Sequence, residues 1–276
     1  MRRTAIILVV IAAGALLGAC GKSAHFGSAH AASAKQQSKA SGHAPAPLTE
    51  VAAKKLAVAL NLQHGDLPAF KVSSSGRQHE TPAEKARERK LIRCVGGHAA
   101  AGALAEASSK TFERQASVVH VGVGSSVTIV HTSTQASQGL DAMRSQRTQV
   151  CLTQFVDQLI AGEKTHGGGS FKLGSVSKAT PSARGTSGTF AWRIAGVYTL
   201  NSLHIPFYMD LVGFAYEQDE VQLLAYGIPV PFPPVGVQTL FSLLVERAKA
   251  GGHLAPRGKG ARPSVPDESG PQQVQI

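Results

Sequence analysis

The pattern of apolar and polar residues divides the chain into a long central part and two polar ends. Between Leu48 and Ala250, apolar side chains recur at helical or strand spacing, whereas residues 20–47 and 251–276 are rich in Ala, Ser, Gly, Gln and Lys or Pro. Such polar segments bury too little apolar surface to offset the entropy lost on ordering. The pattern predicts one domain over residues 48–250, a disordered tether over 20–47 and a disordered tail over 251–276.

Helical spacing is clearest after Thr81-Pro82-Ala83-Glu84, where Thr and Glu have the spacing of a capping box and proline takes the first helical position. We expect a helix from there to Cys94, ending before Gly96. The segment 100–108 is assigned to a short helix on its alanines alone. Apolar rows predict further helices over residues 49–60, 135–161 and 237–250.

Alternating β-branched and aromatic residues predict the strands. Residues 117–132 read as one or two strands, with Gly122 and Gly124 marking a turn or a bulge. Four later segments, joined by short connections that favour antiparallel pairing, cover residues 171–178, 189–200, 205–216 and 221–227. The fold class that follows is α+β, an antiparallel sheet packed with helices.

The first residues have the layout of a secretory signal. Arg2 and Arg3 precede an apolar run of about fifteen residues, shorter than the roughly 20 that span a bilayer. The following Leu17-Gly18-Ala19-Cys20 resembles the lipobox of bacterial lipoproteins, in which the cysteine is lipid-modified and becomes the first mature residue. The resemblance implies a signal peptide over residues 1–19, lipid attachment at Cys20 and a lipid-anchored location on the extracytoplasmic face of the cell membrane. Export by the Sec or the twin-arginine route stays open.

Charge narrows the classes of partner. The chain has 28 Lys and Arg against 17 Asp and Glu, a formal net charge of +11. A basic protein outside the membrane meets anionic envelope polymers and lipid headgroups. Aromatic residues make up only 5% of the chain, so a base-stacking surface is not expected and nucleic acid is not a predicted partner.

The remaining two cysteines, Cys94 and Cys151, form an even set once Cys20 is assigned to lipid. Because the extracytoplasmic compartment permits disulfides, we expect a bond that clamps the helix ending near Cys94 onto the helix containing Cys151. The alternative is two buried free thiols.

Signals for catalysis and metal binding are weak. The chain has no G-x-S-x-G nucleophile elbow and no H-E-x-x-H motif, and we predict no catalytic residue, metal or cofactor. His120 and His131 flank the predicted Gly-Ser turn, either as a pair facing each other or as two surface histidines. Weak ligand-binding candidates are Trp192, Tyr198 and Asp210, the last a carboxylate inside an apolar strand, set either in a polar pocket or on the solvent face.

Several segments together resemble a known family. They are CVGG (94–97), SSVTIV (125–130), RSQRTQVCLTQF (144–155), PFYMDLVGF (206–214) and LFSLLVERA (240–248). Their order is similar to that of actinobacterial extracytoplasmic lipoproteins with a PsbP-like domain and, more loosely, of the extracellular sensor domains of mycobacterial receptor kinases. The resemblance implies an α/β/α sandwich.

The sequence thus favours a lipid-anchored extracytoplasmic binding protein without catalysis. Its domain would bind a small amphipathic ligand between the sheet and the helices, or dock an envelope protein. Two alternatives remain: a cell-envelope hydrolase with dispersed site residues, and a structural lipoprotein that binds anionic polymer through its basic ends.

Overall fold

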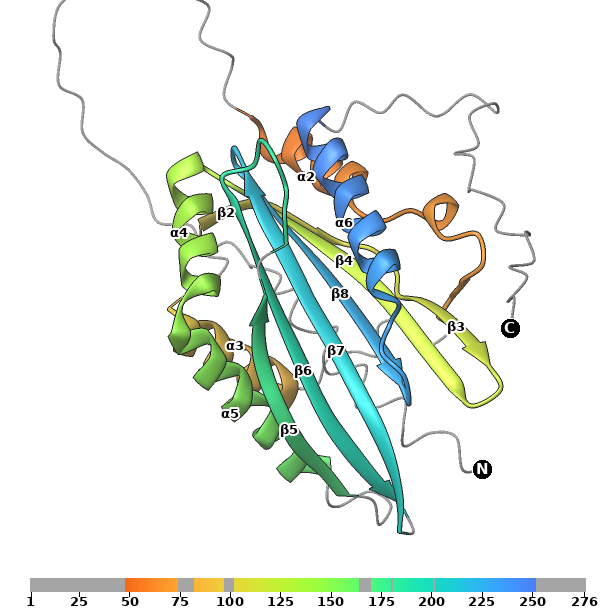
Figure 1. Cartoon of the computed structure of the whole chain (residues 1–276). Coiled ribbons are helices and arrows are strands. Elements are labelled where there is room, and N and C mark those ends of the chain that lie inside the picture. The colour runs from red at the N-terminus through yellow and green to blue at the C-terminus, as the bar shows by residue number, and fades with distance from the viewer. Residues whose placement is uncertain are drawn as a thin grey trace, which may run out of the picture.

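Helices cover both faces of one antiparallel sheet in the computed structural model (Figure 1). The structure describes residues 48–73, 82–96, 102–163, 170–179, 181–200 and 202–251. The predicted α+β class is therefore confirmed. The predicted signal peptide, Cys20 and tether, and all but the first residue of the tail, lie outside the described residues.

The sheet has eight strands in the order β1-β3-β4-β8-β7-β6-β5, and β2 also pairs with β4. All pairings are antiparallel. The strands are β1 (Lys71–Val72), β2 (Ala103–Ser108), β3 (Phe112–Ala116), β4 (Val119–Val130), β5 (Ser170–Ala179), β6 (Gly188–Leu200), β7 (Leu203–Tyr216) and β8 (Asp219–Ile228). The four strands predicted after residue 170 are confirmed.

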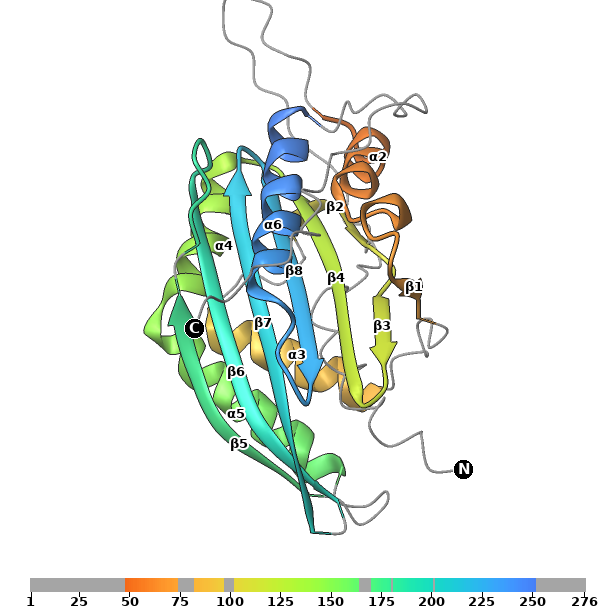
Figure 2. The ribbon, with the colours of Figure 1, turned by 45° about the vertical axis from the view of Figure 1, so that its right-hand side comes forward.

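Of the helices in the described residues, α2 (Glu50–Leu60) and α6 (Pro234–Lys249) pack on one face of the sheet and α3 (Pro82–Val95), α4 (Ser133–Arg144) and α5 (Gln146–Glu163) on the other (Figure 2). A short 3-10 helix, η2 (His64–Asp66), follows α2. The start of α2 and the end of α6 lie side by side at one end of the molecule in both views. None of the described helices is long and apolar enough to cross a bilayer.

Each face of the sheet has its own apolar core. Phe214, Leu223 and Phe241 lie in the core beneath α2 and α6. Trp192 and Leu152 lie in the core beneath α3, α4 and α5. Because the central strands are covered on both faces, apolar residues follow one another along them without strict alternation, as in the run around Phe214.

One predicted element is wrong, and residues 117–132 contain one strand, which is one of the two alternatives expected there. Residues 103–108 form strand β2, not a helix, because pairing along β4 outweighs the intrinsic helix preference of alanine. No turn interrupts residues 119–130, since β4 is one continuous strand. Gly122 lies beneath the Tyr226 ring, where an added Cβ would stand 2.2 Å from Cζ, so the glycine reflects close packing.

The predicted helix over residues 135–161 is two helices. Ser145 ends α4, and its hydroxyl donates a hydrogen bond of 2.8 Å to the Ala142 carbonyl while accepting one of 3.3 Å from the Thr148 amide. A serine that bonds the backbone in this way favours a helix end over a helix interior. The break lets α4 and α5 follow different parts of the sheet (Figure 1).

Candidate functional site

The three residues predicted to bind a ligand do not converge. Trp192 stands opposite Leu211, whereas Asp210 stands opposite Arg193 on the same two strands. Neighbouring residues of a strand point to opposite faces, so Trp192 and Asp210 lie on different sides of the sheet. Trp192 is 1% exposed and its indole donates a 2.8 Å hydrogen bond to the Met143 carbonyl. Tyr198, partly buried, pairs with Ile205 and Phe171 farther along β6.

Asp210 forms an ion pair with Arg193. Its two carboxylate oxygens accept hydrogen bonds of 2.6 and 2.8 Å from the Arg193 guanidinium. The hydrogen bonds from Arg193 to Asp210 are the main cause that raises the pKa of Arg193. A carboxylate satisfied in this way has its cost of burial offset inside the sheet. The pair explains why an acid is tolerated in an apolar strand.

His120 and His131 do not face each other. His120 is the second residue of the continuous strand β4 and His131 directly follows its end, so they stand roughly 37 Å apart at about 3.4 Å per residue. His120 instead lies beside Glu113, with 3.7 Å between Nε2 and Oε2, and its ring meets that of Tyr226 edge to face. Of the two alternatives for these histidines, the facing pair is therefore excluded, because no turn within β4 brings them together.

Glu113, His120 and Tyr226 form a compact polar cluster. The Tyr226 hydroxyl donates a 2.8 Å hydrogen bond to Glu113 Oε1. The neighbouring His120 imidazole is the first cause of a lowered pKa at Glu113, and burial is the first cause of a raised pKa at Tyr226. Tyr226 donates to Glu113 and His120 lies beside the same carboxylate, which is typical of a structural cluster on a sheet.

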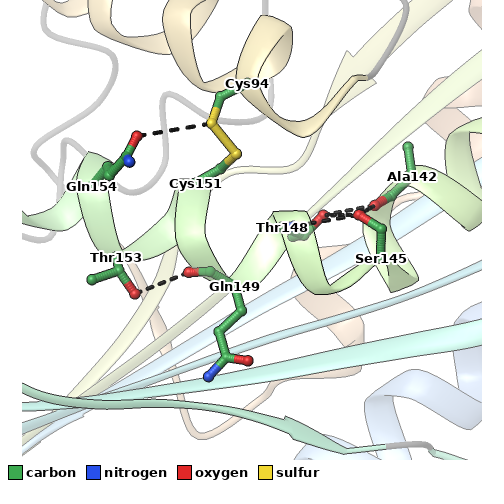
Figure 3. The surroundings of a disulfide bond; sticks show 8 residues. All are labelled: Cys94, Ala142, Ser145, Thr148, Gln149, Cys151, Thr153 and Gln154. Carbon is green, nitrogen blue, oxygen red and sulfur yellow. Dashed lines mark hydrogen bonds between the residues drawn. A yellow bond between two sulfur atoms is a disulfide. The ribbon is translucent and has the colours of Figure 1, made fainter.

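The two cysteines of the domain are joined as expected. Cys94 and Cys151 form a disulfide with 5.7 Å between their Cα atoms, which links the end of α3 to the second turn of α5 (Figure 3). Gln154 Oε1 lies 4.0 Å from Cys94 Sγ. Because a disulfide sulfur carries no hydrogen, this approach is a packing contact and not a hydrogen bond. Gln154 and the disulfide thus share the side of α5 that faces α3.

A hollow of about 310 Å³ lies between α3 and α5 around this disulfide. Leu91 and Phe155, 6% and 7% exposed, provide apolar walls. Basic and amide side chains complete the lining, which consists of Arg87, Lys90, Leu91, Arg93, Cys94, Cys151, Gln154, Phe155 and Gln158. An apolar interior with a few polar groups is the usual composition of a small-molecule site.

The basic side of the hollow comes from one helix. Arg87, Lys90 and Arg93 follow one another at intervals of three residues, which places them on one side of α3. Lys90 and Arg93 are exposed, whereas Arg87 is half-buried. Arg87 Nε is buried, and the described part of the chain offers it no hydrogen-bond acceptor. Buried donors are normally paired, so this atom marks a place where an acceptor would be stabilised.

The disulfide could be predicted from the sequence, but the hollow beside it was not predicted. The signal available was the R-x-x-K-x-x-R spacing of residues 87–93, directly before Cys94. That spacing alone is also typical of a solvated helix face. Only the crossing of α3 over α5 turns it into one wall of a site.

The comparisons with known proteins are sparse. No family model matches the chain, and no curated protein matches it. Among solved structures, the chain is similar to the extracellular domain of PknH from Mycobacterium tuberculosis, at 8% identity and a TM-score of 0.25, over 59% of this chain and 91% of that one. It is also similar to PA94 from Pseudomonas aeruginosa, a protein of unknown function, at 8% identity and a TM-score of 0.21, over 56% and 85% of the two chains.

Proposed function

We propose that this protein is a lipid-anchored binding protein on the extracytoplasmic face of the cell membrane, without catalysis of its own, which holds a small amphipathic ligand between α3 and α5. The observation that carries the proposal is the hollow of about 310 Å³ with apolar walls and a polar rim. Its volume is at the lower end of the roughly 300–1,000 Å³ of ligand sites. The site differs from the predicted one, which was placed between the sheet and the helices.

The walls of the hollow are held in place before any ligand arrives. The Cys94–Cys151 bond fixes α3 on α5 directly beside the apolar residues of the hollow. A site whose walls are fixed in advance loses less entropy on binding. This favours a role in holding a ligand over a role as a flexible spacer.

Binding is favoured over hydrolysis because the carboxylates of the two polar clusters are already hydrogen-bonded to other side chains. Asp210 is engaged by Arg193, and Glu113 by Tyr226, each at hydrogen-bonding distance. A hydrolytic site needs a nucleophile within reach of a general base, facing a substrate-sized space. The hollow instead brings together cations, amides, apolar side chains and a disulfide. These groups bind ligands but supply no activated nucleophile.

Native mass spectrometry of the protein extracted from its own membranes tests this function. We expect a bound small lipid in the wild type and a loss of most of it in Gln154→Trp, which fills the rim of the hollow. The matched control is Val150→Trp, because Val150 is an exposed residue of α5 outside the hollow. Equal adducts in both variants, or no adduct in the wild type, would contradict the proposal. A lipoprotein that binds only polymer through its ends gives the second result.

A further inference from the structure

The charge of the hollow points to the kind of ligand. Among the described side chains that line the hollow, three of nine are cationic and none is acidic. None of the three cations, Arg87, Lys90 and Arg93, forms a salt bridge with an acid in the described parts of the chain. Positive charge that the described residues leave without an acidic partner inside a concave surface attracts anions. A neutral or cationic head group would gain nothing from this wall.

Arg87 can bind an anion in a defined orientation as well as attract it. Its Nε is buried without an acceptor in the described residues, and it lies beside the apolar walls of the hollow. A guanidinium presents its donors as a planar fork that matches two oxygens of a phosphate or a carboxylate. An anionic group placed here would accept a hydrogen bond from Nε that no described residue accepts. Lys90 and Arg93, both exposed, stand on the same helix at the rim.

The apolar part of the hollow suits a hydrocarbon chain. Leu91 and Phe155 are almost fully buried around the Cys94–Cys151 disulfide, and Gln154 and Gln158 of α5 line the rest. Burial of alkyl groups against such walls is favourable at about 25 cal/mol per Å². A hollow of about 310 Å³ that opens to solvent accommodates a head group with the first part of one chain.

We infer that the ligand is a single-chain anionic amphiphile, whose phosphate or carboxylate is bound by Arg87, Lys90 and Arg93 while its chain lies over Leu91 and Phe155. The inference rests on the proposed function and specifies its ligand. Arg87 is the central residue, because it alone joins a buried donor to the apolar walls.

Calorimetric titration with short amphiphiles tests the inference on the chain from Gly21 to Ile276, which keeps every described residue. The probes share one eight-carbon chain: octyl phosphate, octanoate and octanol, with inorganic phosphate as the chainless anion. We expect both anionic amphiphiles to bind at least tenfold more tightly than octanol. Inorganic phosphate should bind more weakly than octyl phosphate, which distinguishes a lipid from a free anion. The ratio of octyl phosphate to octanoate affinity identifies the preferred head group.

Variants of α3 assign the effect to the hollow. Arg87→Gln should lower the affinity for octyl phosphate to that for octanol and leave octanol binding unchanged. Arg87→Lys, which keeps the charge but loses Nε, should give an intermediate loss. Arg89→Gln is the matched control, since Arg89 is exposed on the same helix and does not line the hollow. Unfolding curves of all variants verify that each is folded.

Three results would overturn the inference. If octanol binds as tightly as octyl phosphate, the anion preference is wrong although a binding hollow remains. If Arg89→Gln weakens binding as much as Arg87→Gln, the attraction belongs to the whole surface and not to the hollow. If no amphiphile binds to the folded wild type, the inference and the proposed function fail together.

Discussion

Asp219 and Glu220 are adjacent carboxyl groups at the start of β8 that point to opposite faces of the sheet. Burial is the main cause that raises the pKa of each carboxyl group to about 7. The negative charge of Glu217 raises the pKa of Asp219 further, and the negative charge of Glu106 does so for Glu220. Glu220 packs against Gly139 of α4, where an added Cβ would stand 2.2 Å from Oε1. Near neutral pH the fold therefore carries two carboxyl groups that are not fully ionised.

This arrangement predicts a stability that falls as the pH rises. The pKa of Asp219 is about 7 in the fold and near 4 in an unfolded chain, so the folded state binds more protons between these values. The contribution of the protonated Asp219 to the stability of the fold is complete below about pH 4 and is lost as the pH rises through about 7. Asp219→Asn should raise the melting temperature at pH 8 by a few degrees, since about 1 kcal/mol corresponds to about 2–4 °C in a domain of this size.

Thermal unfolding between pH 4 and pH 8 measures the effect. The gain of Asp219→Asn should shrink steadily on acidification and vanish near pH 4. The control is Glu217→Gln, which removes the same charge at an exposed neighbour and should give a smaller gain. A gain in Asp219→Asn that is the same at both ends of this range would disprove the raised pKa as its cause.

The disulfide fixes how two elements, α3 and α5, meet. It closes a loop between residues 57 positions apart, and loop-closure entropy gives about 4 kcal/mol for such a loop. Cys94→Ser and Cys151→Ser should each lower the melting temperature by roughly 10 °C, and the double variant by little more than either. Unfolding curves under non-reducing conditions check this. If the two single variants differ widely, packing of one thiol and not the bond itself carries the stability.

Elements were predictable where the pattern was long and the side chains strongly apolar. The strands after residue 170 followed from alternation, and the start of α3 from its capping-box spacing and proline. Strand β2 was missed because its alanines favour a helix, a preference that pairing with β4 overrides. The break at Ser145 was missed because the apolar rows continue on both sides of it.

The candidate site was predictable only in part. The Cys94–Cys151 pair could be inferred from compartment and number, without knowledge of the packing. The hollow depends on which sides of α3 and α5 meet, which no local pattern specifies. Trp192 was predicted as a ligand-binding residue, yet it is a core side chain that is 1% exposed.

At the scale of the whole molecule, one buried network joins the first and the last of the described helices. The Arg247 guanidinium of α6 donates a hydrogen bond of 2.7 Å to the Asn61 carbonyl and one of 2.6 Å to Asp66 Oδ1. The Asn61 side chain in turn donates to the Ala107 carbonyl and accepts from the Ser125 hydroxyl. The sheet, α2 and α6 are thereby held together by polar contacts as well as by their apolar core.

The membrane anchor is a prediction for the whole protein, because Cys20 lies outside the described residues. One acyl chain binds a membrane only marginally, so durable anchoring requires the multiple chains that a lipobox implies. Cells fed labelled palmitate should incorporate it into the wild type and not into Cys20→Ala. The variant should also leave the membrane fraction. Equal labelling of the two proteins would refute the anchor.

The start of α2 and the end of α6 are neighbours. The chain can therefore be joined there and opened at another place while every element keeps its position. A circular permutant can be made by joining residue 251 to residue 48 through a short glycine-serine linker. Its new ends would lie between Arg184 and Gly185, which are exposed between β5 and β6. We expect this permutant to fold cooperatively and to form the Cys94–Cys151 bond, because β5 and β6 still meet in the same sheet. A chain that stays unfolded would instead show that synthesis must begin at α2.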